Sequence, residues 1–205
     1  MDAAPHRVKV VGNSGAGKTT FARELARRLD VPHLELDAAF WGAGWQLVDA
    51  ADGRAAVSRF LTTPEAERGW VVDGNWNSRL GDVLTGLEAV VWLDFPRYVV
   101  LARVLRRTLV RAALRVELWH GNRERWSSLV RRQPEENIVL WAWTQHDAYR
   151  AQYLRLAADG TIPVIRLGHP REARRWLRDV RAADQAHGWL SARREPGRSR
   201  GARRT

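Results

Sequence analysis

The sequence predicts an α/β domain in which a parallel β-sheet is flanked by helices. Short apolar runs alternate with segments of helical period, as in sheets whose parallel strands are joined by crossover helices. Two of the runs are too continuously apolar for a sheet with one face in water. A glycine-rich turn stands between the first run and the first helical segment. With 205 residues, 45% of them hydrophobic, the chain can bury one core, so we expect a single domain over residues 1–190.

The apolar runs mark the expected strands. RVKVVG opens the series, and the runs GWVVDG and AVVWLDF are apolar enough to be buried between two layers of helices. HLELD is the shortest of the runs, and IPVIRL is the last. Five strands are expected, at residues 7–12, 33–37, 69–74, 89–95 and 162–167.

Helical segments fill the intervals between these runs. The first is expected from Lys18 to Leu29, where Arg27 and Arg28 suit the negative C-terminal end of the helix. Pro96 suits the first turn of a long helix, because an N–H group there would have no intrahelical partner. The other expected helices cover about residues 49–61, from 96 towards 118, about 134–157 and 170–182.

The glycine-rich turn fits the pattern G-x-x-x-x-G-K-[ST] at every fixed position. Its glycines allow backbone N–H groups to turn inward around phosphate oxygens, at the positive end of the following helix. Lys18 is placed to reach the β- and γ-phosphates of ATP, and the Thr19 hydroxyl to coordinate Mg²⁺. The expected nucleotide-binding residues of the turn are Gly12, Asn13, Ser14, Gly15, Ala16, Gly17, Lys18, Thr19 and Thr20.

Lysine usage supports a chemical requirement at this turn. The chain has 34 lysines and arginines, yet lysine occurs only at Lys9 and Lys18. A compact ammonium fits a tight phosphate cradle, whereas a planar guanidinium is a poor substitute there. We therefore interpret the turn as a binding site for the phosphates of a nucleoside triphosphate.

Aspartates stand near the C-terminal ends of three of the expected strands, at the edge where open parallel sheets bind ligands. Asp37, Asp73 and Asp94 each lie at or next to a strand end. Such a carboxylate can hold magnesium-bound water or accept the proton of the group that is phosphorylated. A strand-end aspartate is also a common helix cap or turn residue, and that alternative stays open.

Four motifs, followed by an arginine-bearing helix, carry a resemblance to a known family: GNSGAGKTT, HLELDAAFWGAGW, WVVDGNW and VVWLDFPR. Over about residues 7–180 the chain resembles the adenylate-kinase-related P-loop NTPases often described as topology modulation protein, FlaR-like. The resemblance implies a five-stranded parallel sheet in the order 2-3-1-4-5 with flanking helices. It also implies a nucleotide-kinase-like helical lid at about residues 118–134.

The resemblance assigns roles to single residues as well. It places Asp73 near magnesium, beside Thr19, and Asn75 near the acceptor. Arg103 and Arg107 match two arginines that contact the nucleotide and the transferring phosphate, although a solvated helical face has the same spacing. The remaining implied site residues are His169, in the loop that borders the adenine, and the lid arginines Arg123, Arg125, Arg131 and Arg132.

The acceptor region departs from the adenylate kinases. Those enzymes grip a monophosphate with an arginine, whereas here a Gly/Trp loop precedes one short helix with Arg54 and Arg59. Tryptophans in such a loop can stack on a base, cover an apolar substrate or simply pack, and AMP is not assumed as the acceptor. The candidate acceptor-binding residues are Asp37, Trp41, Trp45, Asn75 and Trp76.

Composition limits other classes of function. The chain has no cysteine, which excludes thiolate metal sites, and its six histidines show no zinc-ligand spacing. It shows no signal-peptide pattern and no membrane-spanning apolar stretch, so we expect a cytoplasmic protein without membrane contact. Residues 191–205 carry six arginines and one glutamate, and we expect a disordered basic tail there. A solvated end is one interpretation of this tail, and a weak, salt-sensitive contact with nucleic acid is the other.

Two main hypotheses for function result, with two lesser ones beside them. We favour a kinase that moves the γ-phosphate of ATP, with Mg²⁺, to a small nucleotide, nucleoside or hydroxyl metabolite. The alternative is a slow or non-catalytic NTPase that regulates nucleic acid. A metabolite kinase of the shikimate or gluconate sort and an NTPase with a protein partner complete the set. The expected catalytic residues are Lys18, Asp37, Asp73, Arg103 and Arg107.

Overall fold

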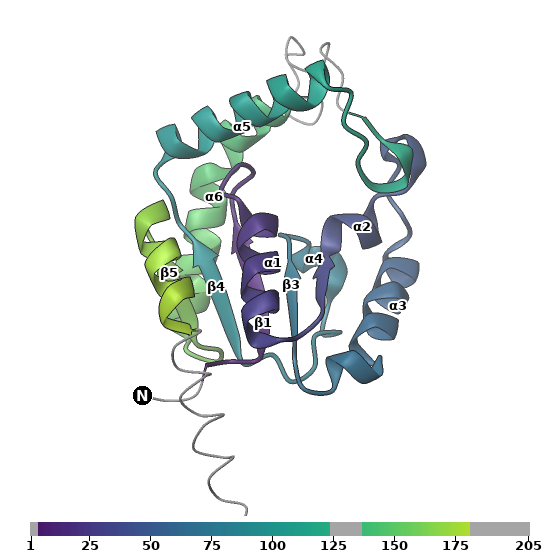
Figure 1. Cartoon of the computed structure of the whole chain (residues 1–205), viewed down its shortest axis with the longest axis vertical. Coiled ribbons are helices and arrows are strands. Elements are labelled where there is room, and N and C mark those ends of the chain that lie inside the picture. Colours follow the sequence, from purple (N-terminus) through teal and green to yellow (C-terminus); the bar gives the residue numbers. More distant parts are fainter. Residues whose placement is uncertain (1–3, 124–136, 181–205) are drawn as a thin grey trace, which may run out of the picture.

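A central parallel sheet carries helices on both of its faces (Figure 1). The structure is a computed structural model that describes residues 4–123 and 137–180. Its five strands lie in the order β2-β3-β1-β4-β5, so the expected α/β fold and strand order are confirmed. None of the helices in the described ranges is both long enough and apolar enough to cross a membrane.

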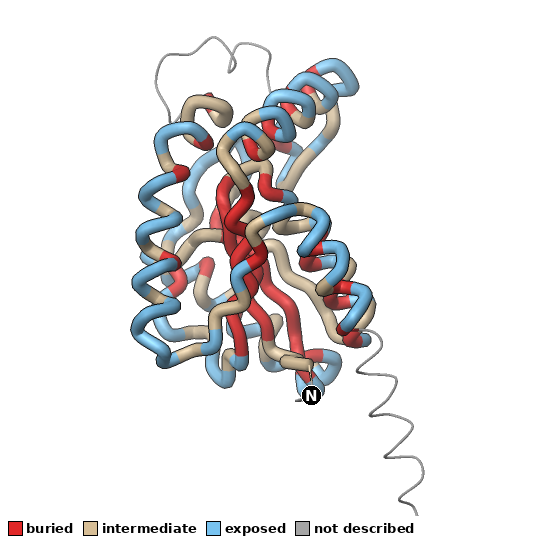
Figure 2. The backbone as a smooth tube through the Cα atoms, turned by 90° about the vertical axis from the view of Figure 1, so that its left-hand side faces the viewer, coloured by how far each residue is buried: buried red, intermediate tan, exposed pale blue. Residues whose placement is uncertain are grey.

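The strands are most deeply buried where the sequence is most continuously apolar. β1 (Arg7–Gly12) lies between β3 (Trp70–Asp73) and β4 (Ala89–Leu93), and every residue of β3 and β4 is buried. β2 (His33–Glu35) and β5 (Val164–Leu167) form the two edges. Figure 2 shows this buried centre between helices whose outer sides are exposed.

Two sets of helices cover the sheet, because successive residues of a strand point to opposite faces. α1 (Lys18–Leu29) and the helical residues 170–180 share one core cluster with the sheet. α3 (Ala50–Leu61) and α4 (Asn77–Leu80) contribute to a second cluster, and α6 (Ile138–Asp159) to a third, on the opposite face.

The connections on the acceptor side are short. α2 (Leu36–Phe40) follows β2 directly and leads into the Gly/Trp loop, residues 41–47, which holds the single turn η1 (Ala43–Trp45). A β-bridge between Trp41 and Leu47 closes this loop. A second single turn, η2 (Pro64–Ala66), precedes β3.

α5 (Arg97–Ala113) crosses above the end of the sheet that carries the glycine-rich turn (Figure 1). The chain then descends through residues 114–123, which we call the bridging segment and which include the single turn η3 (Trp119–Gly121). The segment is anchored on the Gly/Trp loop, where the Asn122 side chain donates to the Gly42 carbonyl at 2.8 Å and accepts from the Trp45 N–H at 3.0 Å.

Several expected boundaries were wrong. The second strand ends at Glu35 instead of residue 37, because α2 begins at once. The long helix ends at Ala113 instead of running towards Leu118, and Arg115 then adopts a left-handed conformation with φ 47°.

Two further boundaries differ near the end of the chain. β5 begins at Val164, two residues later than expected, directly after Pro163, which has no N–H to donate to a ladder. α6 begins at Ile138, and the Asn137 side chain caps it by accepting from the Val139 and Leu140 N–H groups. The expected start near residue 134, most of the expected lid and the whole tail lie outside the described residues.

Candidate functional site

The glycine-rich turn is held in a conformation that only glycine adopts readily at several positions. Gly15 has φ 86° and Gly17 has φ 90°. A Cβ atom on Gly15 would lie 2.3 Å from the Val104 side chain and 2.7 Å from the Val100 carbonyl oxygen. α5 therefore packs directly against the turn, and a larger residue at this position would separate the two.

Lys18 lies folded over this turn. Its ammonium donates to the Gly12 carbonyl at 2.9 Å and to the Asn13 carbonyl at 3.2 Å. Burial lowers the pKa of Lys18, while the nearby Asp37 and Asp73 carboxylates oppose that effect. A desolvated ammonium held over the glycine-rich turn, beside the N-terminus of a helix, can bind an anion strongly.

Thr19 and Asp73 form an oxygen pair beside the turn. The Thr19 hydroxyl donates to one oxygen of the Asp73 carboxylate at 3.0 Å, and the His33 ring nitrogen lies 2.7 Å from the other oxygen. Asp73 is buried, at 3% exposure, and its two oxygens are held by Thr19 and His33. His33 orients the carboxylate towards Thr19.

This pair suits a magnesium ion. Mg²⁺ prefers oxygen ligands, and it usually binds through one or two protein groups together with phosphate oxygens and water. The hydroxyl and the carboxylate are such groups. Within the described ranges, no cluster of three or more His, Cys, Asp or Glu side chains forms a metal site of its own.

Asp37 lies on α2 and not at a strand end, yet it still faces the turn. Its carboxylate accepts from the Trp76 indole N–H at 2.6 Å. Burial raises the pKa of Asp37, an effect that the Lys18 charge and the indole hydrogen bond oppose. A carboxylate with a raised pKa is better matched to proton transfer near neutral pH than an ordinary aspartate.

A buried polar network supports the turn from below. The Asn75 side chain donates to the Gly12 carbonyl at 2.8 Å, and its oxygen accepts from the Tyr153 hydroxyl at 3.0 Å. Asn77 links Tyr153, at 3.4 Å, to the buried ammonium of Lys9. Burial lowers the Lys9 pKa to about 8.

Two arginines of α5 approach the turn from above. The Arg103 guanidinium donates to the Ala16 carbonyl at 3.0 Å and lies 5.3 Å from the centre of the Phe95 ring. The charge of Arg107 lowers the pKa of Lys18, so the two cations face a common region. Arg106, between them in the sequence, is exposed.

Four tryptophans form a continuous group beside Asp37, which we call the tryptophan wall. The rings of Trp41 and Trp76 meet edge to face at 5.4 Å, and those of Trp41 and Trp45 at 5.9 Å. Trp119 of the bridging segment meets Trp45 edge to face at 6.4 Å, and its indole donates to Glu35 at 3.1 Å. The expected candidates Trp41, Trp45 and Trp76 are thus brought together, and Trp119 joins them.

Other candidates lie apart from this group. Asp94 is held by Arg166 at 2.5 Å, with Arg150 at 3.7 Å. The His169 ring nitrogen accepts from the Arg171 N–H at 3.1 Å and so caps the helical residues 170–180. Arg123 pairs with Glu117 at 3.3 Å. The lid arginines Arg125, Arg131 and Arg132 fall outside the described residues.

Sequence reasoning missed the residues that act through others. His33 opens the motif HLELDAAFWGAGW but was given no role, Asn77 and Tyr153 belong to no recognised motif, and Tyr153 is contributed by α6, far along the chain. The Asn13 side chain, expected at the nucleotide, is buried and donates to the Ala142 carbonyl at 2.7 Å. One signal for the network of Asn77 and Tyr153 was present in the sequence: Lys9, which bonds to Asn77, is one of only two lysines in a chain rich in arginine.

We predict that His33→Ala lowers the affinity for magnesium, so that more magnesium is needed for activity, without abolishing nucleotide binding. The Asp73 carboxylate loses the group that orients it, and loss of such outer partners typically costs about ten- to a hundred-fold in metal affinity or activity. Magnesium titrations of ADP formation at saturating ATP measure the change. His33→Gln, which can still donate from its amide, is expected to recover part of the loss. Equal magnesium dependence in all three proteins would contradict this role.

Comparison with known proteins adds one informative similarity. No protein-family model matches the sequence. An alignment of 133 residues is 28% identical to an adenylate kinase of Moorella thermoacetica, and it takes in 51% of this chain and 60% of that enzyme. The chain therefore matches less than two thirds of the length of this relative.

A solved gluconokinase from Sinorhizobium meliloti is 19% identical, with a TM-score of 0.47 over 95% of this chain and 100% of that one. The adenylate kinase similarity, the confirmed sheet order and the glycine-rich phosphate motif together support a nucleotide-kinase-like P-loop protein.

Proposed function

We propose that the chain is an ATP-dependent phosphotransferase that passes the γ-phosphate to a small hydroxyl compound. One observation carries this proposal: the ammonium of Lys18, the Thr19–Asp73 pair and the half-buried Asp37 carboxylate converge on one turn. A simple nucleotide switch needs the first two. A carboxylate with a raised pKa beside them adds the group that a transfer to a hydroxyl requires.

The turn would hold the phosphates through its backbone N–H groups and Lys18. Thr19 and Asp73 would hold Mg²⁺, which when bound neutralises charge on the phosphate oxygens. Arg103 and Arg107 would lie on the α5 side of the γ-phosphate, where charge spreads over its equatorial oxygens in the transition state. His33 and Asn75 position other groups and do not touch the reacting atoms.

In the transfer step the acceptor hydroxyl loses its proton to the Asp37 carboxylate. Its oxygen forms a new bond to the γ-phosphorus while the bond from that phosphorus to the bridging oxygen of ADP breaks, and ADP leaves with the bonding electrons. Lys18 and the arginines take no part in this proton transfer and balance charge.

The proposal predicts an acid limb in the pH profile of kcat/KM. Asp37 accepts a proton only when it is ionised, so activity is lost as pH falls through its pKa. Because burial raises that pKa, the midpoint lies above the ordinary value of 3.8. Asp37→Asn is expected to lower kcat by about 10²- to 10⁴-fold, and its residual activity should lack this limb. A limb unchanged in Asp37→Asn would assign it to another group.

ADP formation from ATP and magnesium, measured with a panel of nucleosides, nucleotides and hydroxyl metabolites, tests the function itself. One acceptor class should raise the rate of ADP formation many-fold above the rate measured without any acceptor. A protein that binds ATP but is stimulated by none of them would instead be a slow NTPase.

A further inference from the structure

We infer that the acceptor is an uncharged hydroxyl compound with a flat face, such as a nucleoside or a ring sugar, which binds against the tryptophan wall and is preferred over a phosphate monoester. The inference rests on the proposed phosphotransferase function and names its substrate class. It comes from what the wall contains and from where the nearby arginines are engaged.

The wall and the phosphate turn are joined by Asp37. On one side its negative charge raises the pKa of Lys18. On the other side its carboxylate accepts a hydrogen bond from the Trp76 indole N–H at 2.6 Å. Trp76 then contacts Trp41 edge to face. A molecule that places a hydroxyl at Asp37 therefore has indole rings next to the rest of its body.

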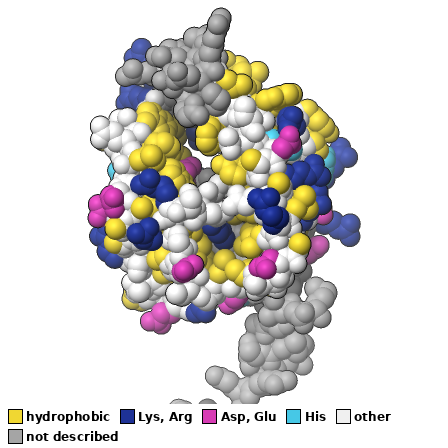
Figure 3. Space-filling view, turned by 180° about the vertical axis from the view of Figure 1, so that it is seen from behind, with side chains coloured by type: hydrophobic (Ala, Val, Ile, Leu, Met, Phe, Trp, Pro, Cys, Tyr) yellow, Lys and Arg dark blue, Asp and Glu magenta, His cyan; other side chains and the backbone are white. Residues whose placement is uncertain are grey.

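The rings are accessible, unlike those of a closed core. Trp41, Trp76 and Trp119 are half-buried, and Trp45 is 38% exposed. A hollow opens on the rear face of the molecule in the space-filling view (Figure 3). Aromatic rings offer a large, rigid contact area to a flat partner, with a preference for stacked or edge-on geometry.

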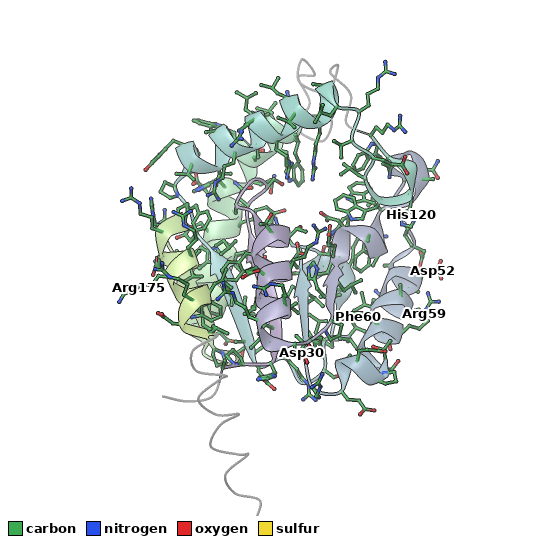
Figure 4. The ribbon with its side chains drawn as sticks, viewed as in Figure 1. Asp30, Asp52, Arg59, Phe60, His120 and Arg175 are labelled. Atoms are coloured by element: carbon green, nitrogen blue, oxygen red, sulfur yellow. The ribbon has the colours of Figure 1, made fainter. Side chains whose placement is uncertain are left out.

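The arginines closest in sequence to the tryptophans of the wall point elsewhere or bond to the backbone. Arg54 donates to the Arg79 carbonyl at 3.1 Å, and Arg79 donates to the Val48 carbonyl. Both therefore hold α3, α4 and the residue that follows the Gly/Trp loop together. Arg59 lies on the outer side of α3, away from the sheet (Figure 4).

Among the described residues, the charged side chains that hydrogen-bond to the wall are the carboxylates of Asp37 and Glu35. Glu35 accepts from the Trp119 indole and also pairs with the exposed Arg23 of α1. Asp37 and Asp73 lie closer to the turn, where Lys18 offsets them. A monoester phosphate bound against these rings would lie beside the Glu35 and Asp37 carboxylates, whose like charge disfavours it.

The wall is assembled from two distant parts of the chain. Trp41, Trp45 and Trp76 come from the sheet side, whereas Trp119 comes from the bridging segment that Asn122 fastens to the Gly/Trp loop. The His120 ring adds a contact at 3.0 Å to the Ala38 carbonyl, at the tip of the segment (Figure 4). Trp119 thus forms the end of the wall opposite Trp76.

Matched pairs of acceptors test the substrate class. ADP formation is measured with each nucleoside and its own 5′-monophosphate, and separately with ring sugars, at equal concentrations. We expect at least a ten-fold higher kcat/KM for members of the uncharged set than for any monophosphate. The nucleoside and sugar arms decide which flat face is used.

The outcomes separate the inference from the function. Stimulation mainly by a monophosphate would overturn the inference and leave the phosphotransferase intact. Failure of every acceptor, with ATP still bound, would overturn both.

A binding measurement gives a readout besides turnover. Calorimetric titration with the best uncharged acceptor, in the presence of magnesium and a non-hydrolysable ATP analogue, compares the parent with Trp41→Ala, Trp41→Phe and Trp143→Ala. Trp41→Ala is expected to bind about ten-fold more weakly, as for loss of one ring under a stacked ligand, and Trp41→Phe to recover part of that loss. Trp143, half-exposed on α6 beside Arg97, is the matched control and should leave affinity unchanged. Equal affinities in all four proteins would overturn the role of the wall.

Discussion

Replacement of Lys18 by alanine is expected to weaken ATP binding by about a hundred-fold and to abolish turnover. The lost ammonium lies over the turn and would make charge-assisted contacts to two phosphates, each stronger than a neutral hydrogen bond. The fold should survive, because desolvation of the half-buried Lys18 ammonium, which lowers its pKa, is a cost that alanine does not carry. Titration calorimetry with ATP and magnesium measures the affinity, and thermal unfolding should show a midpoint shifted by less than about 5 °C.

Lys18→Arg is the informative companion to this variant. It keeps the positive charge but replaces a compact ammonium with a planar guanidinium, which the close approach to the Gly12 and Asn13 carbonyls does not accommodate. It should therefore fail almost as badly as Lys18→Ala. Normal ATP affinity in Lys18→Ala would show that the phosphates bind elsewhere.

Replacement of Arg107 by alanine is expected to lower kcat by about a thousand-fold, with a much smaller effect on ATP affinity. Arg107 and Lys18 are like charges close enough for one to lower the pKa of the other, and an anion between them relieves that repulsion. The relief is greatest when charge develops on the transferring phosphate, where an arginine can contribute 10³-fold or more to the rate. Single-turnover kinetics separate the chemical step from binding.

Arg106→Ala provides the matched control for this experiment. It removes the same type of side chain from the neighbouring, exposed position of α5. Its kcat should stay within about two-fold of the parent, as is usual for exposed positions away from a site. Equal losses in the two variants would mean that α5 acts through its overall charge and that Arg107 has no specific part in catalysis.

The parts of the structure that depend on local pattern were predictable. The strand β1, the glycine-rich turn and α1 occupy the expected residues, because a motif and its flanking elements are encoded within a few positions. The strand order was implied by the resemblance and is confirmed. Element ends were less predictable, as at β2, where Leu36 starts a helix instead of extending the strand.

Contacts between distant segments were beyond the reach of the sequence. His33 meets Asp73 across 40 positions, and Trp45 meets Asn122 across 77. Neither pair shows any local periodicity, since each depends on how the sheet and α5 bring separate segments together. The wall was therefore anticipated as three tryptophans on one side, without its fourth ring and without the bridging segment that fastens it.

The measurement that tests the central claim most directly follows the γ-phosphate of ATP to its destination. The protein is incubated with magnesium, ATP labelled at the γ-phosphate and the most stimulating acceptor, with Lys18→Ala in parallel. We predict that the label appears on the acceptor hydroxyl in an amount equal to the ADP formed, and that Lys18→Ala transfers none. Label released wholly as inorganic phosphate, at a rate that no acceptor changes, would contradict a phosphotransferase and leave only an NTPase.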